Sequence, residues 1–289
     1  MSLPVRLPYF DALLALLEEG HSDLEQAFGR HVHWGYWPLP ESARPSPEDF
    51  AEAAEALTRV VCEAAAVTDD DAILDAGCGF GGTADSLNQR HRDVRVCGLN
   101  LDRRQLRRAA RLFRPEGNNS LHWVQGDACR LPFPDRYFDA AVAVECIFHF
   151  GSRERFFREA FRVLKPGRKL ALSDFVPRPL AKPWFRLAAL WPTGLGFYGR
   201  CRVDHTLADY RRLAAATGFR LDSVQDITAN TLPTYDALRY LASQFRRPAL
   251  AAAVETLLVE WSSRLGSLRY LVLRFEKPPE PREEASVGQ

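Results

Sequence analysis

Short apolar segments alternate with helical periodicity between residues 72 and 174, and this alternation limits the fold more than any other feature of the chain. Five apolar segments have the length and content of strands: AILDA, VRVCGL, LHWV, FDAAVAV and KLALSD. Segments this apolar are typical of a sheet that is covered on both faces, and the gaps between them leave room for crossover helices. The pattern predicts an α/β fold built on a parallel sheet.

Two of the gaps contain clear helical patterns. Asp102 and Gln105 have the spacing of an N-terminal capping pair, and apolar side chains follow on one helical face up to Phe113. The other face carries four arginines between residues 103 and 108, which we interpret as a solvated face rather than a phosphate site. Residues 152–164 repeat the helical pattern, and Lys165-Pro166-Gly167 predicts a turn into the next strand.

The remaining segments predict four regions along the chain. They are an N-terminal helical arm and cap (1–66), a cofactor-binding α/β core (67–176), a region that completes the same domain (177–276) and a disordered tail (277–289). Within the third region, the proline-rich and aromatic-rich stretch 177–205 is expected to be a lid over a pocket. Further expected elements are helices at 8–20, 48–66, 206–217 and 235–265 and strands at 219–227 and 267–275.

Charge and cysteine content exclude several classes of protein. The chain of 289 residues has 38 Lys and Arg against 37 Asp and Glu, so it offers no electrostatic case for nucleic acid. No apolar run is long enough for a membrane span, and the N-terminus lacks the pattern of a secretory signal, so we expect a cytoplasmic protein. The six cysteines contain no C-x-x-C pair, which favours free, buried thiols over a metal site or disulfides.

A glycine-rich segment follows the first predicted strand and precedes a helix, from Asp75 through Gly77, Cys78 and Gly79 to Thr83. This is the setting of a nucleotide-type ligand at the carboxyl end of a parallel sheet, where glycine lets the backbone approach the ligand. The acid before the first glycine distinguishes the segment from the Gly-x-Gly-x-x-Gly fingerprint of dehydrogenases. The D-x-G-x-G arrangement resembles the first motif of class I S-adenosylmethionine-dependent methyltransferases.

The resemblance continues in order along the chain. Residues 97–100 (CGLN) are similar to the end of the family's second strand, and residues 125–128 (QGDA) to its adenine-binding turn. Residues 131–139 (LPFPDRYFD) and 162–167 (RVLKPG) resemble the family's runs before strands four and five. The resemblance implies a Rossmann-like, doubly wound, mostly parallel sheet of seven strands with an antiparallel last strand, plus an N-terminal helical arm and helical lid insertions.

The same resemblance implies S-adenosyl-L-methionine (SAM) as the cofactor. Asn100 stands where the family more often has a ribose-binding acid, and its carbonyl can still accept a hydroxyl, in a neutral and weaker bond. Residues 31–38 look like the H-x-G-Y-W segment that covers the methionine end of SAM, although a packing role for Trp37 stays open. The expected cofactor-binding residues are Tyr36, Trp37, Asp75, Gly77, Cys78, Gly79, Thr83, Asn100, Leu101, Gln105, Asp127, Ala128 and Glu145.

Two residues are expected to be catalytic. Residues 145–149 (ECIFH) are similar to the E-S-x-x-H segment of natural-product methyltransferases, which implies that His149 lies at the methyl-transfer site. A histidine can accept a hydroxyl proton near neutral pH, and a carboxylate beside it would fix its tautomer. We therefore hypothesise that His149 is the general base and that Asp174 is its orienting partner or a substrate anchor. A packing role for His149 remains the alternative.

The predicted activity is methyl transfer to a hydroxyl of an apolar secondary metabolite, because a hydroxyl needs the proposed base. C-methylation of a prenyl diphosphate, a terpenoid or an electron-rich ring is one alternative, and a magnesium requirement would favour the diphosphate acceptor. A catalytically silent cofactor-binding module is another. The expected partner is a largely apolar small-molecule acceptor, and a homodimer is left open. No metal site is expected, since His31 and His33 have no matching ligand cluster.

Overall fold

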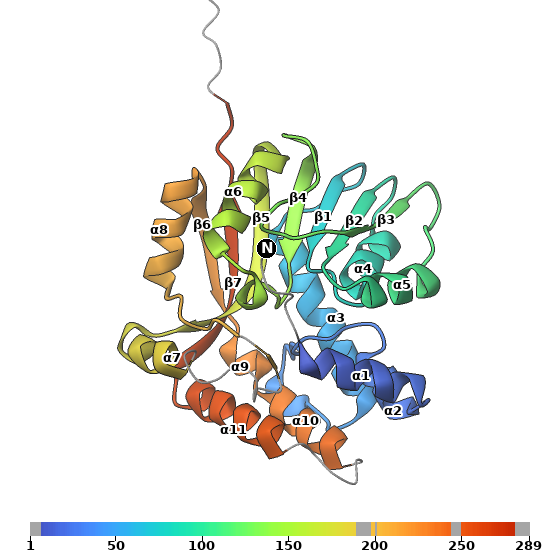
Figure 1. The fold of residues 1–289 in the computed structure, drawn as a ribbon, viewed down its shortest axis with the longest axis vertical. Coiled ribbons are helices and arrows are strands. Elements are labelled where there is room, and N and C mark those ends of the chain that lie inside the picture. The colour runs from blue at the N-terminus through green and yellow to red at the C-terminus, as the bar shows by residue number, and fades with distance from the viewer. Residues whose placement is uncertain (1–6, 189–197, 200, 244–249, 281–289) are drawn as a thin grey trace, which may run out of the picture.

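Seven strands form one sheet in the order β3-β2-β1-β4-β5-β7-β6 in a computed structural model, which describes residues 7–188, 198–199, 201–243 and 250–280 (Figure 1). The strands are β1 Ala72–Ala76, β2 Arg95–Asn100, β3 Ser120–Gln125, β4 Phe138–Ala143, β5 Leu164–Pro177, β6 Arg220–Asp226 and β7 Leu268–Glu276. Neighbours from β3 to β5 are parallel, whereas β7 is antiparallel to both β5 and β6. The predicted seven-stranded, mostly parallel sheet is confirmed.

Helices cover both faces of the sheet because successive strand residues point to opposite sides. On one face, Leu74 packs with Phe156 of α6 (Arg153–Val163) and Tyr210 of α8 (Leu207–Thr217). On the other face, Ile73 packs with Leu57 of α3 (Pro47–Ala64) and with α4 (Gly82–Arg90). The result is a three-layer α/β fold whose strand ends stay accessible at the loops.

The helix after β2, α5 (Arg103–Leu112), begins as expected but its cap differs from the prediction. The Asp102 side chain accepts a hydrogen bond from the Arg104 backbone N–H at 2.8 Å. The capping box is not formed, because the Asp102 backbone N–H donates to Asn100 Oδ1 at 3.3 Å and the Gln105 Oε1 accepts from Asn100 Nδ2 at 2.9 Å. Gln105 therefore links the loop after β2 to the start of α5.

The N-terminal arm contains two helices, α1 (Pro8–Glu18) and α2 (Ser22–Phe28), of which the sequence predicted the first. Arg104 pairs with Asp11 of α1 and Arg108 pairs with Glu25 of α2, so the arginine face of α5 is only partly solvated. Exposed ion pairs of this kind contribute little each, about 0–1 kcal/mol. Their main consequence is positional, because they hold the arm beside the glycine-rich loop.

The region after β5 is more helical than expected. Short helices η3 (Pro179–Ala181) and α7 (Lys182–Ala188) occupy the first part of the predicted lid; residues 189–197 and 200 of the lid lie outside the described residues. The predicted helix 235–265 is two helices, α10 (Pro233–Ser243) and α11 (Leu250–Arg264), after the short α9 (Thr228–Thr231). Within the described residues, no helix is long and apolar enough to cross a bilayer.

The predicted tail begins too early. Lys277 is buried, and its Nζ donates to the carbonyl oxygens of Phe161 and Leu164 at 2.6 and 2.7 Å. The aliphatic stem and the two carbonyl acceptors explain why a lysine next to a Pro-Pro pair is ordered. Residues 281–289 lie outside the described residues.

Candidate active site

The glycine loop after β1 uses its glycines for different purposes. Gly77 has φ +84°, and a Cβ there would lie 2.8 Å from the Sγ of Cys146, so glycine is needed for the close approach of the loop after β4. Gly79 has φ +53°, but a Cβ there would meet no atom within 4 Å. Gly77 therefore closes the inner side of the loop, whereas Gly79 borders open space where a ligand can approach.

Asp75 is the last polar group before this loop, and its carboxyl is not fully satisfied. The side chain is 2% exposed, and its Oδ2 has no hydrogen-bond partner among the described residues. Burial raises the pKa of Asp75 to about 7, partly offset by the backbone N–H of Ala84. A buried carboxyl oxygen without a donor is uncommon in folded proteins. The ammonium group of a methionine moiety would supply such a donor, so this position fits SAM.

The ends of β2 and β3 lie beside the glycine loop. Asn100 is opposite Gln125 in the sheet, and the Gly77 N–H donates to Leu99 O at 2.8 Å. Asn100 Nδ2 donates to Gln105 Oε1 and, at 3.4 Å, to Gly79 O, which fixes the amide beside the loop. The structure thus brings the predicted ribose-binding residue to the predicted cofactor loop.

The predicted adenine side of the site is more open. Leu101 is 48% exposed at the end of β2, and Asp127 is exposed after β3 while its Oδ1 accepts from Cys129 N at 2.8 Å. Ala128 is buried beneath this turn. An exposed apolar side chain beside an exposed carboxylate matches a purine, which has an apolar face and an amino donor. Cys78 and Thr83, by contrast, are buried within the loop and α4.

Glu145 joins three distant parts of the chain at the end of β4. Its Oε2 accepts from the Trp34 backbone N–H at 2.9 Å and from the Tyr270 hydroxyl, and its own N–H donates to Ser173 Oγ at 3.0 Å. Burial raises the pKa of Glu145 to about 8. Its protein contacts make Glu145 a junction of the arm, β4 and β7. The sequence placed Trp34 in the arm segment 31–38 but linked neither Trp34 nor Tyr270 to Glu145, since no local pattern links residues more than 100 positions apart.

The aromatic residues of the arm fall into two groups. Tyr36 packs against the apolar cluster that contains Phe148, next to His149. Trp37 instead packs on Phe50 of α3, and its indole N–H donates to Asp49 at 2.6 Å. The structure therefore does not bring Trp37 to the glycine loop, and the packing role left open for it is the one observed.

His31 and His33 hold the arm against α3 and α4. His31 Nε2 lies 2.9 Å from Glu55 of α3, and His33 Nε2 lies 3.2 Å from the Thr58 hydroxyl. Burial lowers the pKa of His33 to about 3, so its ring is neutral in the folded protein. A Cβ on Gly82 would lie 2.6 Å from His31 Nδ1, so His31 packs directly on the start of α4.

His149 lies in a short helical turn after β4, η2 (Ile147–His149), with contacts on both ring nitrogens. Its Nε2 is 3.5 Å from the Tyr9 hydroxyl of α1, and its Nδ1 is 3.9 Å from Cys201 Sγ. The next residue, Phe150, reaches the glycine loop, since a Cβ on Gly77 would lie 3.5 Å from its ring. The imidazole therefore lies between Tyr9 of the arm and Cys201 of the predicted lid, next to the residue that reaches the glycine loop.

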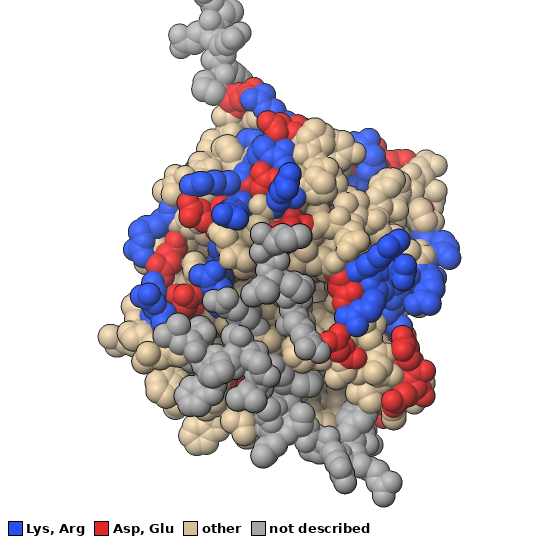
Figure 2. Space-filling view, in the orientation of Figure 1, with Lys and Arg blue, Asp and Glu red and all other residues tan. Residues whose placement is uncertain are grey.

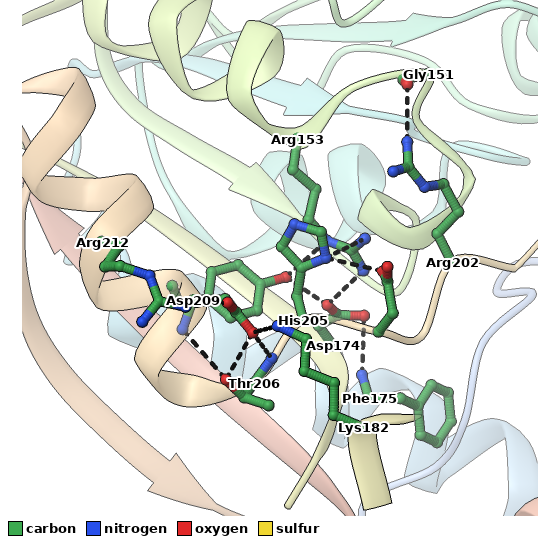
Figure 3. A network of polar contacts seen from close by, with 12 residues as sticks. Gly151, Arg153, Asp174, Phe175, Lys182, Arg202, His205, Thr206, Asp209 and Arg212 are labelled. Carbon is green, nitrogen blue, oxygen red and sulfur yellow. Dashed lines mark hydrogen bonds and ion pairs between the residues drawn. The ribbon is translucent and has the colours of Figure 1, made fainter. Parts of the chain in front are cut away.

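The structure does not bring Asp174 to His149, which was one of the two roles expected for it, as orienting partner or substrate anchor. Its Oδ2 accepts from Arg153 Nη2 at 2.9 Å and from the Tyr210 hydroxyl, while its Oδ1 accepts from Phe175 N at 2.9 Å (Figure 3). The carboxylate is fully buried in this network. The physical reason is the buried guanidinium, whose charge requires a buried counterion more strongly than an imidazole does.

Comparisons with known proteins agree with this geometry. A family model described as a methyltransferase domain matches residues 74–172. The 27-O-demethylrifamycin SV methyltransferase of Amycolatopsis mediterranei is 30% identical over 267 residues, which cover 88% of this chain and 93% of that protein.

Solved structures share the fold. The [4+2]-cyclase SpnF superposes with a TM-score of 0.72 at 24% identity, over 94% of each chain. Geranyl diphosphate C-methyltransferase from Streptomyces coelicolor A3(2), solved with Mg²⁺, geranyl diphosphate and S-adenosyl-L-homocysteine (SAH), superposes with a TM-score of 0.69 at 20% identity, over 96% of this chain and 100% of that one. Sequence similarity across almost the whole length, together with the glycine loop and the strand order, leads to one conclusion: the chain belongs to the SAM-dependent methyltransferases.

Proposed function

We propose that the chain transfers the methyl group of SAM to a hydroxyl of a largely apolar small molecule, and that His149 is the general base. The observation that carries the proposal is the position of His149: its imidazole lies 3.5 Å from the Tyr9 hydroxyl of the arm, and the adjacent Phe150 reaches Gly77 of the glycine loop. Imidazole is the side chain best suited to accept a proton at neutral pH. The neighbouring groups are not, because burial raises the pKa of the Cys201 thiol to about 12 and that of the Tyr9 phenol well above 10.

The residues around the imidazole favour an apolar acceptor. The Trp34 ring contacts the rings of Phe175, Tyr198 and Tyr235 at centroid distances of 5.5, 6.4 and 5.9 Å. Aromatic side chains with a polar edge suit an apolar skeleton that carries hydroxyl groups. The similarity to an enzyme that methylates an oxygen of a rifamycin supports a hydroxyl acceptor.

The chemistry divides between cofactor and protein. When bound, SAM supplies an electrophilic methyl carbon. Asp75, Asn100 and Asp127 would hold its methionine, ribose and adenine parts. The acceptor hydroxyl becomes an ether oxygen and loses its proton, which we assign to His149 Nε2, the nitrogen that faces Tyr9. Alignment of the acceptor and removal of this proton are the two tasks that the chain performs.

The His149→Gln variant tests the base. Turnover of a hydroxylated acceptor, found by screening macrolides and ansamycins that include 27-O-demethylrifamycin SV, is expected to fall about 100-fold. Calorimetry should show that SAH affinity stays within twofold. The matched control is His122→Gln, since His122 is exposed on β3, away from the site, and this variant should keep full turnover. Full turnover in His149→Gln would remove the base assignment.

C-methylation of a prenyl diphosphate is the second candidate, favoured by the structural similarity to geranyl diphosphate C-methyltransferase. Incubation with geranyl diphosphate, SAM and Mg²⁺, with and without a chelator, separates the two. Magnesium-dependent methylation of geranyl diphosphate without methylation of any hydroxylated acceptor would replace the first proposal. Binding of SAH without any turnover would identify a silent cofactor-binding module.

A further inference from the structure

Helix α11 exposes its apolar stripe to solvent. The exposed large apolar residues recur at i, i+3, i+4, i+7 and i+11, which is one side of a helix: Val254, Leu257, Leu258, Trp261 and Leu265. Trp261 is 66% exposed and Leu265 is 76% exposed. A surface helix of a globular protein normally turns such a stripe toward the core. In α11 the buried side instead contains Glu260 and Ser263.

A second apolar group lies next to this stripe. Leu180 of η3 is 98% exposed, and Trp184 and Leu187 of α7 are about two-thirds exposed. Arg178, just before η3, donates from its backbone N to Ser267 O at 2.9 Å and from Nε to Gly266 O at 2.7 Å, immediately after α11. These bonds place the start of η3 beside the residues that follow α11.

We call the combined region the α7–α11 surface, consisting of Leu180, Trp184, Leu187, Val254, Leu257, Leu258, Trp261 and Leu265. Figure 2 shows mainly uncharged atoms at the lower left, where Figure 1 places α7 and the near end of α11. Soluble proteins seldom expose so many large apolar side chains together, and such a patch marks an interaction surface.

The segment that carries α7 is basic. Residues 178–188 contain Arg178, Lys182 and Arg186 and no acid, and Lys182 pairs with Asp209 of α8. The two acids of α11 turn away from the surface: Glu255 accepts from Tyr198 N at 3.3 Å, and Glu260 accepts from Arg239 and Arg264. The surface is therefore apolar with a basic rim.

We propose that the α7–α11 surface docks on a lipid bilayer that contains anionic lipids. Leucine and tryptophan side chains enter the interface between headgroups and acyl chains, and basic residues at the rim pair with anionic headgroups. A second copy of the chain is the competing occupant, and the oligomeric state measured below separates it from the bilayer.

The inner side of α11 connects this surface to the proposed active site. The role that we infer for docking, delivery of an apolar acceptor, therefore rests on the proposed function. Thr256 Oγ1 lies 2.9 Å from the Tyr198 hydroxyl, and the Tyr198 ring lies 5.8 Å from that of Tyr9, beside His149. Bilayer docking would place α11 between the lipid and the aromatic residues around His149. An apolar acceptor dissolved in the bilayer would then have a short path to the base.

Vesicle flotation of the full chain tests the proposal. We expect binding to vesicles of phosphatidylcholine and phosphatidylglycerol, weaker binding to phosphatidylcholine alone, and at least tenfold weaker partitioning of the Leu258→Glu/Trp261→Glu variant. The Arg186→Gln variant should bind anionic vesicles about fivefold more weakly. The matched control is Leu112→Glu on α5, which is 46% exposed outside the surface and should bind like the unmodified chain.

Absence of binding to both kinds of vesicle would overturn the proposal. So would equal losses in Leu112→Glu and the double variant. Light scattering provides the third decisive result: a dimer that the double variant converts to a monomer, with vesicle binding unchanged, would show that the surface joins two copies. SAH binding and turnover of a water-soluble acceptor, measured without vesicles, report on the proposed function separately, and the double variant should leave both unchanged.

Discussion

Asp174 provides the sharpest test of what the buried polar network does. Its carboxylate receives three donors: Arg153 Nη2 and the Tyr210 hydroxyl at Oδ2, and the Phe175 N–H at Oδ1. In Asp174→Asn, one of the two oxygens becomes an NH₂ group, which must face one of these donors in either orientation. The variant also leaves the Arg153 guanidinium buried without its counterion. Loss of one partner of a buried ion pair costs about 3–5 kcal/mol, which is our expected loss in the free energy of unfolding.

Urea unfolding followed by tryptophan fluorescence measures this loss. The matched control is Asp135→Asn, because Asp135 pairs with Arg162 at the surface and should lose at most about 1 kcal/mol. The double variant Arg153→Met/Asp174→Leu should recover much of the lost stability, since an apolar pair can replace a buried ion pair at little cost. A loss below about 1 kcal/mol in Asp174→Asn would refute the reasoning.

The same variant separates a structural from a catalytic role. Asp174 does not contact His149, so turnover at a temperature where the variant is fully folded should change by no more than a few-fold. A fall of about 100-fold under that condition would return Asp174 to the catalytic machinery.

Two further predictions concern the arm and the glycine loop. Because His33 stays neutral down to about pH 3, whereas the unfolded chain gains a proton below pH 6.5, unfolding should become easier by about 2 kcal/mol from pH 6.5 to 5. His33→Gln should flatten this part of a pH series of urea melts, and identical slopes would contradict the assignment. In Gly77→Ala the free energy of unfolding should fall by about 2–4 kcal/mol, because the backbone has φ +84° and the added Cβ would meet Cys146. In the control Gly117→Ala, at φ +54° in open space, it should fall by about 1 kcal/mol. Gly79→Ala should be as stable as Gly117→Ala but bind SAH more weakly by calorimetry; unchanged SAH affinity would place the nucleoside elsewhere.

Local sequence patterns were sufficient for most of the fold. Apolar strands and the Asp102 cap of α5 are encoded within a few residues of the elements they define. The D-x-G-x-G loop belongs to the same class, because its glycines are required by the backbone conformation itself. These features could be predicted since propensity and tertiary structure favour the same outcome. The turn predicted at Lys165-Pro166-Gly167 is wrong, since these residues belong to the start of β5, where the pairing register with β4 shifts.

The parts that could not be predicted depend on pairs that are distant in sequence. The choice of Arg153 and Tyr210 as partners of Asp174, and of Tyr9 and Cys201 as neighbours of His149, is made by the packing of separate elements. Trp37 shows a related difficulty, because a motif specifies that an aromatic residue is present but not which cluster buries it. In α11, the helical period was readable, but its direction relative to the core was not.

The position of β7 has a consequence for how the protein forms. This strand is the last to be synthesised, yet it lies between β5 and β6, so β6 has no neighbour in the sheet until β7 arrives. It also carries Tyr270, whose hydroxyl binds Glu145. A nascent chain that ends before β7 therefore leaves one edge of β5 open to unwanted pairing and cannot yet hold the loop that carries His149. Methylation competence therefore requires that translation has passed β7.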